Sequence, residues 1–102
     1  MPSGPSDPAA CAMRFEWDPD KATRNVVKHG VSFDEALSVF GDPIAVTFAD
    51  TDHVETEDRS RTFGASNRAR VLVVVRTERR EAVRIISARK ATRHEKSIYA
   101  NG

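Results

Sequence analysis

The amino-acid sequence predicts an α+β domain in which helices surround a small antiparallel sheet. Three observations predict it: helix-start signals follow one another after residue 17, short β-branched segments separated by turn residues fill residues 44–88, and a helix-capping pattern returns at residue 92. The expected order is one strand, two helices, four strands and a final helix, which is an α+β layout. With 102 residues, of which 39% are hydrophobic, the chain can build one modest core.

The start of the chain is expected to lie outside this core. Residues 1–12 are rich in Pro, Ser, Ala and Gly and show no periodicity, so they are predicted to form a disordered extension that precedes a single domain over residues 13–102. They also lack the apolar centre of a signal peptide. The single cysteine, Cys11, lies in this extension and supports neither an internal disulfide nor a cysteine metal site.

The first predicted helix has a clear start and end. Asp18 can accept backbone N–H bonds as the N-cap, and Pro19 fits the first helical position, where no donor is needed. The helix should run to about His29, and Gly30 should supply the left-handed residue that ends it. Its buried side is expected to consist of Ala22, Val26 and Val27.

Capping boxes mark two further helices. Ser32 and Glu35 predict a helix that ends at Phe40, and Thr92 and Glu95 predict a last helix over about residues 92–99. The strands are expected at residues 13–17, 44–48, 59–65, 71–77 and 82–88. The segment 71–75 has no polar alternation, which predicts a central strand covered on both faces.

Charge is divided between the two halves of the chain. Residues 1–58 carry 4 Lys or Arg and 12 Asp or Glu, whereas residues 59–102 carry 12 and 3, although the net charge is only +1. Ten of the twelve later cations are arginine, whose guanidinium binds phosphate oxygens in pairs. A basic half predicts a polyanionic partner, most commonly nucleic acid. The alternative is that these arginines pair with the acidic half of the same molecule.

Arg84 is the unusual cation, because it lies inside an apolar strand. Such a cation either emerges on an open sheet face or needs a partner, so two roles stay open. Beside Glu78 it could stabilise a phosphorane, or it could form a structural salt bridge across the sheet. RNA cleavage without a metal needs only a base, an acid and cations. Glu78 and His29 are the candidates for base and acid, with His94 weaker, although His29 could simply cap its helix.

No cofactor, metal or membrane contact is expected. The acidic segment 50–55 lacks the spacing of a calcium loop, and the chain contains no glycine-rich phosphate loop or zinc motif. The longest apolar run, Val71–Val75, is far shorter than the roughly 20 residues of a membrane span. The cytoplasm is therefore the expected compartment.

The sequence resembles the BrnT toxins over residues 13–99. The resemblance lies in the strings FEWD at 15–18, KHGVSF at 28–33, TER at 77–79 and RIISARKA at 84–91. It implies a RelE-like fold and a ribonuclease toxin of a type II toxin–antitoxin pair, which arrests translation and growth. It also implies a BrnA-type antitoxin, whose ribbon-helix-helix domain would make the contact with operator DNA.

The resemblance also implies where the chemistry lies. It places the catalytic residues at Arg76, Glu78, Arg84 and Arg89 and points to Arg79 and Arg93 beside them. Together with the reading of the residues themselves, this makes the expected catalytic residues Arg76, Glu78, Arg84, Arg89 and His29 and the expected RNA-binding residues Arg79, Lys90 and Arg93. Arg84 and Arg89 would bind the scissile phosphate, and Arg76 would orient it. Glu78 would act as the base, and His29 or an arginine as the acid. The alternative function is a non-catalytic module that uses the same basic face to bind RNA or an acidic protein.

Overall fold

The helices and strands of the computed structural model follow the predicted order within residues 14–49, 59–79 and 82–101, which the structure describes. They are β2 (Arg14–Glu16), α2 (Pro19–His29), α3 (Phe33–Val39), β3 (Val46–Ala49), β4 (Arg59–Ala65), β5 (Val71–Arg79), β6 (Ala82–Lys90) and α4 (Arg93–Asn101). The α+β class is therefore confirmed. The predicted extension 1–12 and the acidic segment 50–58 lie outside the described residues. No described helix is long and apolar enough to cross a membrane.

The described strands form one five-stranded sheet in the order β2-β6-β5-β4-β3. The pairs β3–β4, β4–β5 and β5–β6 are antiparallel, whereas β2 runs parallel to β6, with Glu16 opposite Arg84. The sheet is mixed, and the prediction of an antiparallel sheet is wrong in this respect. Two helices and three strands separate β2 from β6 along the chain, so no local turn indicates their relative direction.

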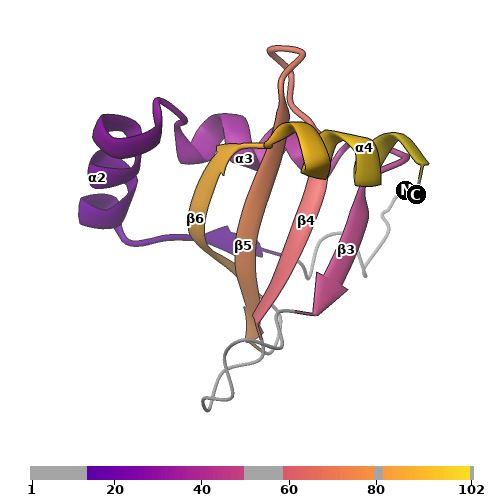
Figure 1. Ribbon diagram of the computed structural model, residues 1–102. Helices are drawn as coiled ribbons and strands as arrows, with labels where there is room; N and C mark the ends of the chain where they lie inside the picture. Colours follow the sequence, from indigo (N-terminus) through magenta and orange to yellow (C-terminus); the bar gives the residue numbers. More distant parts are fainter. Residues whose placement is uncertain (1–13, 50–58, 80–81, 102) are drawn as a thin grey trace, which may run out of the picture.

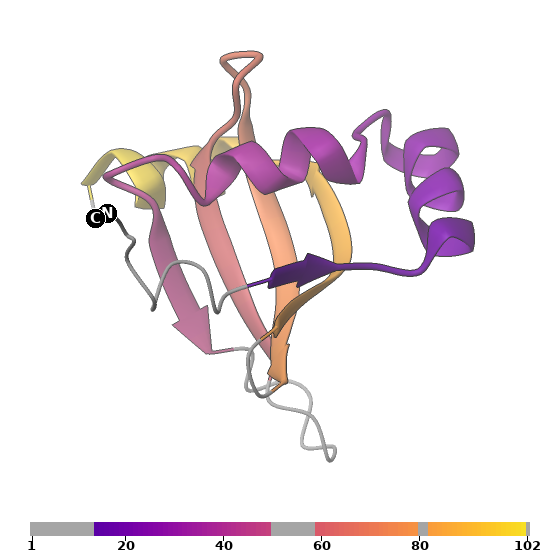
Figure 2. The ribbon, with the colours of Figure 1, turned by 180° about the vertical axis from the view of Figure 1, so that it is seen from behind.

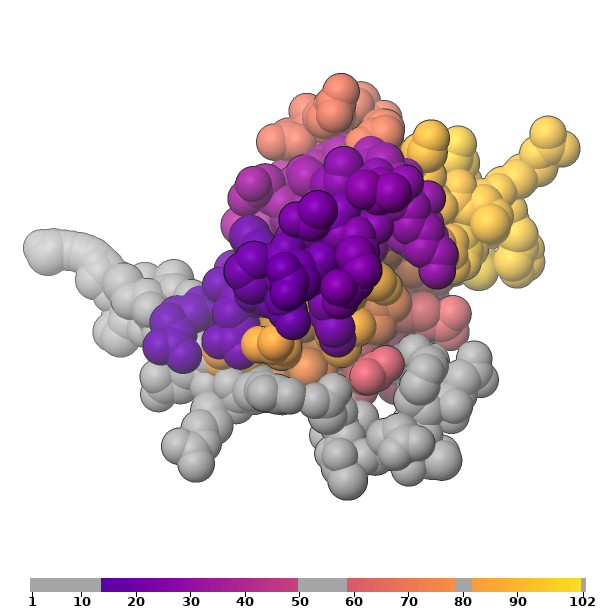
Figure 3. All heavy atoms as spheres, turned by 90° about the vertical axis from the view of Figure 1, so that its left-hand side faces the viewer, coloured from indigo at the N-terminus to yellow at the C-terminus, as the bar shows by residue number. Residues whose placement is uncertain are grey.

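Helices cover the sheet unequally. Figure 1 shows α4 in front of the upper end of the sheet, and Figure 2, the view from behind, shows α3 over the opposite face with β2 crossing below it. α2 stands beside β6, and its atoms form the front of that side of the molecule in Figure 3. The lower part of the sheet face that carries α4 has no described helix in front of it.

The core has one layer on each side of the sheet. The main cluster joins α3 and the preceding Val31 to strands β5 and β6 and consists of Val31, Phe33, Ala36, Val39, Leu72, Val74, Ile85 and Ala88. On the opposite face, Phe63, Val73 and Ala91 pack against the α4 residues Ile98 and Tyr99. Consecutive residues of β5 thus enter opposite layers, which confirms that this strand is covered on both faces.

The helix ends confirm the local signals. The Asp18 carboxylate accepts the N–H of Asp20 at 2.8 Å, and Gly30 has φ +70°. Ser32 Oγ accepts the N–H of Glu35 at 3.0 Å, but the Glu35 side chain does not complete the box. Its buried carboxylate binds Arg70 of the β4–β5 hairpin and Ser66 instead, and the hydrogen bond from Arg70 lowers its pKa.

The buried side of α2 differs from the prediction. Val27 is 82% exposed and Val26 is exposed, whereas Asn25 is only 7% exposed. The Asn25 amide donates to the carbonyls of Val31 at 2.8 Å and Ala88 at 2.7 Å, and its oxygen accepts the N–H of Ala88 at 3.2 Å. Because β2 pairs only with residues 82–84 of β6, this amide serves as the hydrogen-bond partner of the strand beyond them.

Removing that amide should destabilise the domain. For Asn25→Ala we expect a loss of about 2–4 kcal/mol in the free energy of unfolding, because buried backbone groups lose their partners. Urea denaturation measures this loss, and Arg24→Ala, an exposed change at the preceding residue, is the matched control. A value for Asn25→Ala equal to that of the control would contradict the structural role of this amide.

Candidate functional site

β6 contains a one-residue bulge at Ile86. Val75 of β5 pairs with Ser87, and the next residue, Arg76, pairs with Ile85, so Ile86 has no opposite residue in β5. In a regular strand, residues an odd number of positions apart point to opposite faces. An extra residue reverses that relation for everything on either side of it.

The reversal affects both the core and the charged residues of β6. Ile85 and Ala88 are three positions apart, yet both pack into the main cluster. Arg84 and Arg89 are five positions apart, and their partners in β5 are Thr77 and Val73, which are four apart and share one face. The bulge therefore places both arginines on the face that carries α4.

Two arginines of β4 lie on the same face. Arg59 pairs with Thr77, the residue that Arg84 pairs with from the other side, and Arg61 pairs with Val75. Since adjacent strands are separated by roughly 5 Å, the backbones of Arg59 and Arg84 lie roughly 10 Å apart. We call the surface that carries Arg59, Arg61, Arg84 and Arg89 the arginine face. Its lower part is the region without a described helix in Figure 1.

Arg76 and Glu78 lie on the opposite face of the sheet. The Arg76 guanidinium packs 5.6 Å from the centre of the Phe40 ring, and its Nε donates to Thr62 Oγ1 at 3.3 Å. Its Nη1 donates to Glu78 at 2.9 Å, and the Glu78 side chain is 64% exposed. The structure thus separates the four charged residues predicted around the TER and RIISAR strings into two pairs, one on each face.

Each of these three arginines has a carboxylate partner: Arg76 with Glu78, Arg84 with Glu16, and Arg89 with Glu95. The structural salt bridge that the sequence left open for Arg84 is present. Its N–O distance is 3.4 Å, and the two side chains are 30% and 38% exposed. Such a half-exposed pair contributes about 0–1 kcal/mol, so another anion can replace Glu16 at little cost.

The pair of Arg89 and Glu95 is much tighter. The two Arg89 Nη atoms donate to the two carboxylate oxygens at 2.7 and 2.8 Å. The carboxylate also accepts the N–H of Thr92, and Thr92 Oγ1 accepts the N–H of Glu95, which confirms the predicted capping box. The hydrogen bonds from Arg89, opposed by burial, bring the pKa of Glu95 to about 2. This pair therefore fixes the start of α4 to β6.

The other end of α4 is held by Asp42. Its Oδ2 accepts the N–H of Ala65 at 2.8 Å and the hydroxyl of Tyr99 at 2.6 Å. The bond from Ala65, followed by that from Tyr99, lowers the pKa of Asp42, and the same carboxylate raises the pKa of Tyr99. α4 is thus tied down at both ends beside the arginine face.

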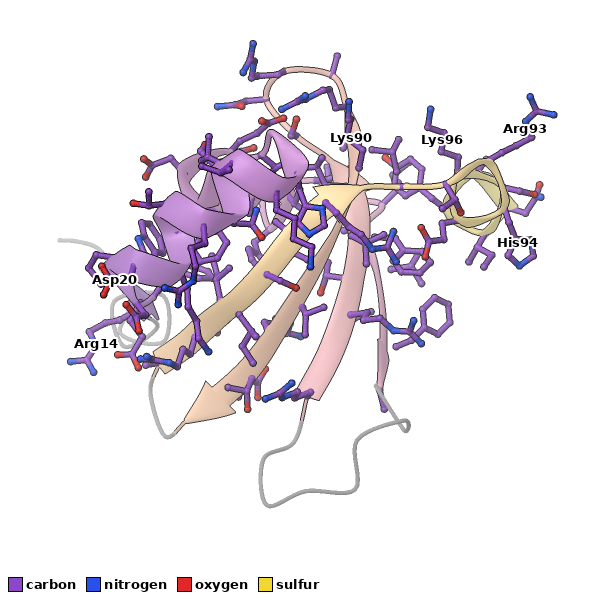
Figure 4. The ribbon with its side chains drawn as sticks, turned by 60° about the vertical axis from the view of Figure 1, so that its left-hand side comes forward. Arg14, Asp20, Lys90, Arg93, His94 and Lys96 are labelled. Carbon is purple, nitrogen blue, oxygen red and sulfur yellow. The ribbon has the colours of Figure 1, made fainter. Side chains whose placement is uncertain are left out.

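The remaining predicted residues are spread over the molecule. Lys90 and Lys96 lie on the upper edge in Figure 4 and line a hollow of about 280 Å³ with Arg70. Arg93 projects outward from α4. Arg79 belongs to the end of β5, and His29 ends α2, where its side chain makes no hydrogen bond to another described residue.

The sequence analysis overlooked three residues of the arginine face. Arg59 and Arg61 are two positions apart in a strand, so strand periodicity alone would have placed them on one face. Phe48 of β3 pairs with Arg61 and is 42% exposed. Its position carried no signal, because an isolated aromatic residue in a strand is usually part of the core. Among the described residues, no three His, Cys, Asp or Glu side chains are grouped so that they could hold a metal ion.

Comparison with known proteins identifies the family. A family model described as the BrnT ribonuclease toxin of type II toxin–antitoxin systems matches residues 17–95. The chain belongs to the BrnT toxin family. This BrnT chain is also similar to the crystal structure of the Brucella abortus ribonuclease toxin BrnT, with 26% identity and a TM-score of 0.57. That alignment covers 79% of this chain and 99% of the Brucella protein. The search of curated proteins gave no match.

Membership confirms the resemblance seen in the sequence. The family consists of ribonuclease toxins of type II toxin–antitoxin systems, so it implies endoribonuclease activity and a cognate antitoxin for this BrnT chain. The mixed α+β sheet agrees with the solved BrnT structure.

Glu95 should make the stability of this BrnT chain depend on pH. The pKa is about 2 in the folded state and 4.5 without the fold, so the ionised carboxylate stabilises the fold above about pH 4.5. This contribution, about 3 kcal/mol, is lost as the pH falls toward 2. Glu95→Gln should lower the free energy of unfolding at pH 7 and reduce its change between pH 4.5 and 2. Urea denaturation across this range is the measurement. Asp34→Asn, an exposed change on α3, is the control, and equal pH dependence in both variants would contradict the assignment.

Proposed function

We propose that this chain is a metal-independent endoribonuclease toxin and that single-stranded RNA crosses its arginine face. The observation that carries the proposal is the β6 bulge, which places Arg84 across Thr77 from Arg59, on the face that also holds Arg61. Guanidinium groups bind phosphate oxygens through paired N–H donors and keep their charge at any physiological pH. Cationic surfaces that follow the backbone are a common way to bind single strands.

Cleavage would proceed by attack of the ribose on the neighbouring phosphate. A base removes the proton of the 2′-OH, the oxygen forms a bond to phosphorus, and the 5′-oxygen leaves with a proton from an acid, giving a 2′,3′-cyclic phosphate. Negative charge builds on the phosphorane, where a fixed cation stabilises it. Arg84 suits this role because its bond to Glu16 is long and half-exposed, so a phosphate can take its place. Arg89 is held by both oxygens of Glu95, and we assign it mainly to the placement of α4.

Glu78 remains our proposal for the base. Its carboxylate is exposed and is held by Arg76, which is itself fixed by Thr62 and the ring of Phe40. Thr77, the residue before it, pairs with Arg84, so Glu78 and Arg84 belong to the same end of β5 and β6. Because the base and the cation act on adjacent atoms of one nucleotide, the proposal requires the side chains of Glu78 and Arg84 to reach the same phosphodiester beyond this end of β5 and β6. His29 stays the candidate for the acid on chemical grounds.

Arg84→Ala tests the arginine face. We expect wild-type protein to cleave single-stranded RNA in EDTA and the variant to cleave it at least roughly 100-fold more slowly, because a donor to the developing charge is lost. The melting temperature should stay near that of wild type, since the bond to Glu16 is loose. Arg24→Ala, which removes an exposed arginine of α2, is the control for net charge. Cleavage only after addition of a divalent metal would refute metal independence, and an unchanged rate in Arg84→Ala would refute the role of this face.

A non-catalytic binding module is the second candidate. The observation that favours it is that three of the predicted arginines already have internal carboxylate partners.

The toxin proposal includes three further expectations: the chain acts in the cytoplasm, arrests translation and has a RelE-like fold. It is neutralised by a BrnA-type ribbon-helix-helix antitoxin, which alone contacts operator DNA.

Induced expression separates the two candidates. We expect growth to stop when the chain is induced, because RNA cleavage stops translation. Growth should resume when the antitoxin is co-expressed, because the antitoxin neutralises the toxin. The measurement is growth, with protein yield checked by immunoblot and Arg84→Ala as the inactive control. Normal growth at high confirmed yield would support the binding module and contradict the toxin proposal.

A further inference from the structure

A second feature of the arginine face lies between its upper part and α4. A hollow of about 380 Å³ is lined by Phe48, Arg61, Phe63, His94 and Ile98, among others. Its volume falls within the roughly 300–1,000 Å³ of small-ligand pockets. The walls are aromatic and aliphatic except for the Arg61 guanidinium, the His94 imidazole and the Glu95 carboxylate, whose two oxygens already accept hydrogen bonds from Arg89. Figure 4 shows His94 projecting from α4 in a different direction from Arg93.

Phe48 offers an aromatic surface to this hollow. Its ring meets Phe63 at a centroid distance of 5.5 Å and an angle of 61°, an edge contact that holds the ring in place. The side chain nevertheless remains 42% exposed. One exposed aromatic residue needs no explanation by itself. Here, however, the ring stands directly across the strands from an arginine on the same face.

Arg61 differs from the paired arginines of this protein, because no described group binds its side chain. Its Nε is buried and has no hydrogen-bond partner, and no ion pair joins it to another residue in the described part of the chain. Arg76, Arg84 and Arg89 each bind a carboxylate instead. Because no described carboxylate holds the Arg61 guanidinium, an incoming phosphate has no internal partner to displace there.

We propose that this hollow binds one nucleobase of the RNA substrate, stacked on Phe48, while Arg61 donates to the phosphate of the same nucleotide. Stacking on an aromatic ring beside a cation is the common way to hold single-stranded nucleic acid. The subsite lies beside the row of Arg59, Thr77 and Arg84, so it takes a nucleotide next to the scissile phosphate. The inference rests on the proposed function, because its occupant is the RNA substrate.

The test uses a short single-stranded 2′-O-methyl oligoribonucleotide, which lacks the nucleophile and stays intact. Its affinity for the full chain is measured by fluorescence anisotropy in EDTA at several salt concentrations. Phe48→Ala should weaken binding roughly 5- to 100-fold, and Phe48→Tyr should restore it, because a stacked base is worth about 1–3 kcal/mol. Arg61→Ala should weaken binding and reduce the slope of log affinity against log salt by about one, as expected for one lost phosphate contact. Ile44→Ala, an exposed apolar change just before β3, is the control and should bind as wild type.

Phe48→Leu guards against a folding artefact, since it keeps apolar volume without an aromatic face. Lost affinity in Phe48→Leu at an unchanged melting temperature supports stacking. Wild-type affinity in both Phe48→Ala and Arg61→Ala, with cleavable RNA still processed, would overturn the subsite and leave the ribonuclease proposal standing. Failure of the wild-type chain to bind or cleave any RNA would overturn both. Variants that lose the antitoxin but keep the oligonucleotide would make the hollow a protein interface and would likewise overturn the subsite.

Discussion

The extra residue Ile86 in β6 determines which side chains reach each face of the sheet. The core requires Ile85 and Ala88 on the side of α3, and they are an odd number of positions apart. The same insertion that reconciles them with one face brings Arg84 and Arg89 together on the other. Packing and charge placement are therefore satisfied by a single irregularity. In a regular strand, only one half of β6 would keep its apolar residues on the core side, and the other half would place its side chains on the wrong face.

Carboxylates neutralise the arginines of the basic surface to different degrees. Glu95 holds Arg89 with both oxygens, Glu16 holds Arg84 loosely at 3.4 Å, and no described carboxylate holds Arg61. Positive charge is thus tightly compensated at Arg89, loosely compensated at Arg84, and without a described carboxylate at Arg61. In the proposed function, this gradation lets the chain carry several internal ion pairs and still present a cationic surface to RNA.

Local signals predicted the helix ends well, because Asp18, Gly30 and Thr92 act on backbone groups a few residues away. The parallel pairing of β2 and the bulge at Ile86 escaped prediction because both depend on contacts between distant segments. The family resemblance indicated the correct activity class. The placement of its charged residues on two faces could only come from strand register. Asn25 was overlooked as a buried residue because its burial depends on a partner 63 positions away.

The amide of Asn25 also affects whether the sheet of one molecule can pair with a strand of another. An edge strand with free N–H and carbonyl groups invites pairing with a strand from a second molecule, and this is a route to aggregation. In β6, β2 occupies the first three residues of that edge, and Asn25 occupies the groups of Ala88 further along. A side chain thus closes an edge that the short β2 leaves incomplete. Among the described strands, the outer edges of the three-residue β2 and the four-residue β3 then remain, and their shortness limits any intermolecular sheet to a few residue pairs.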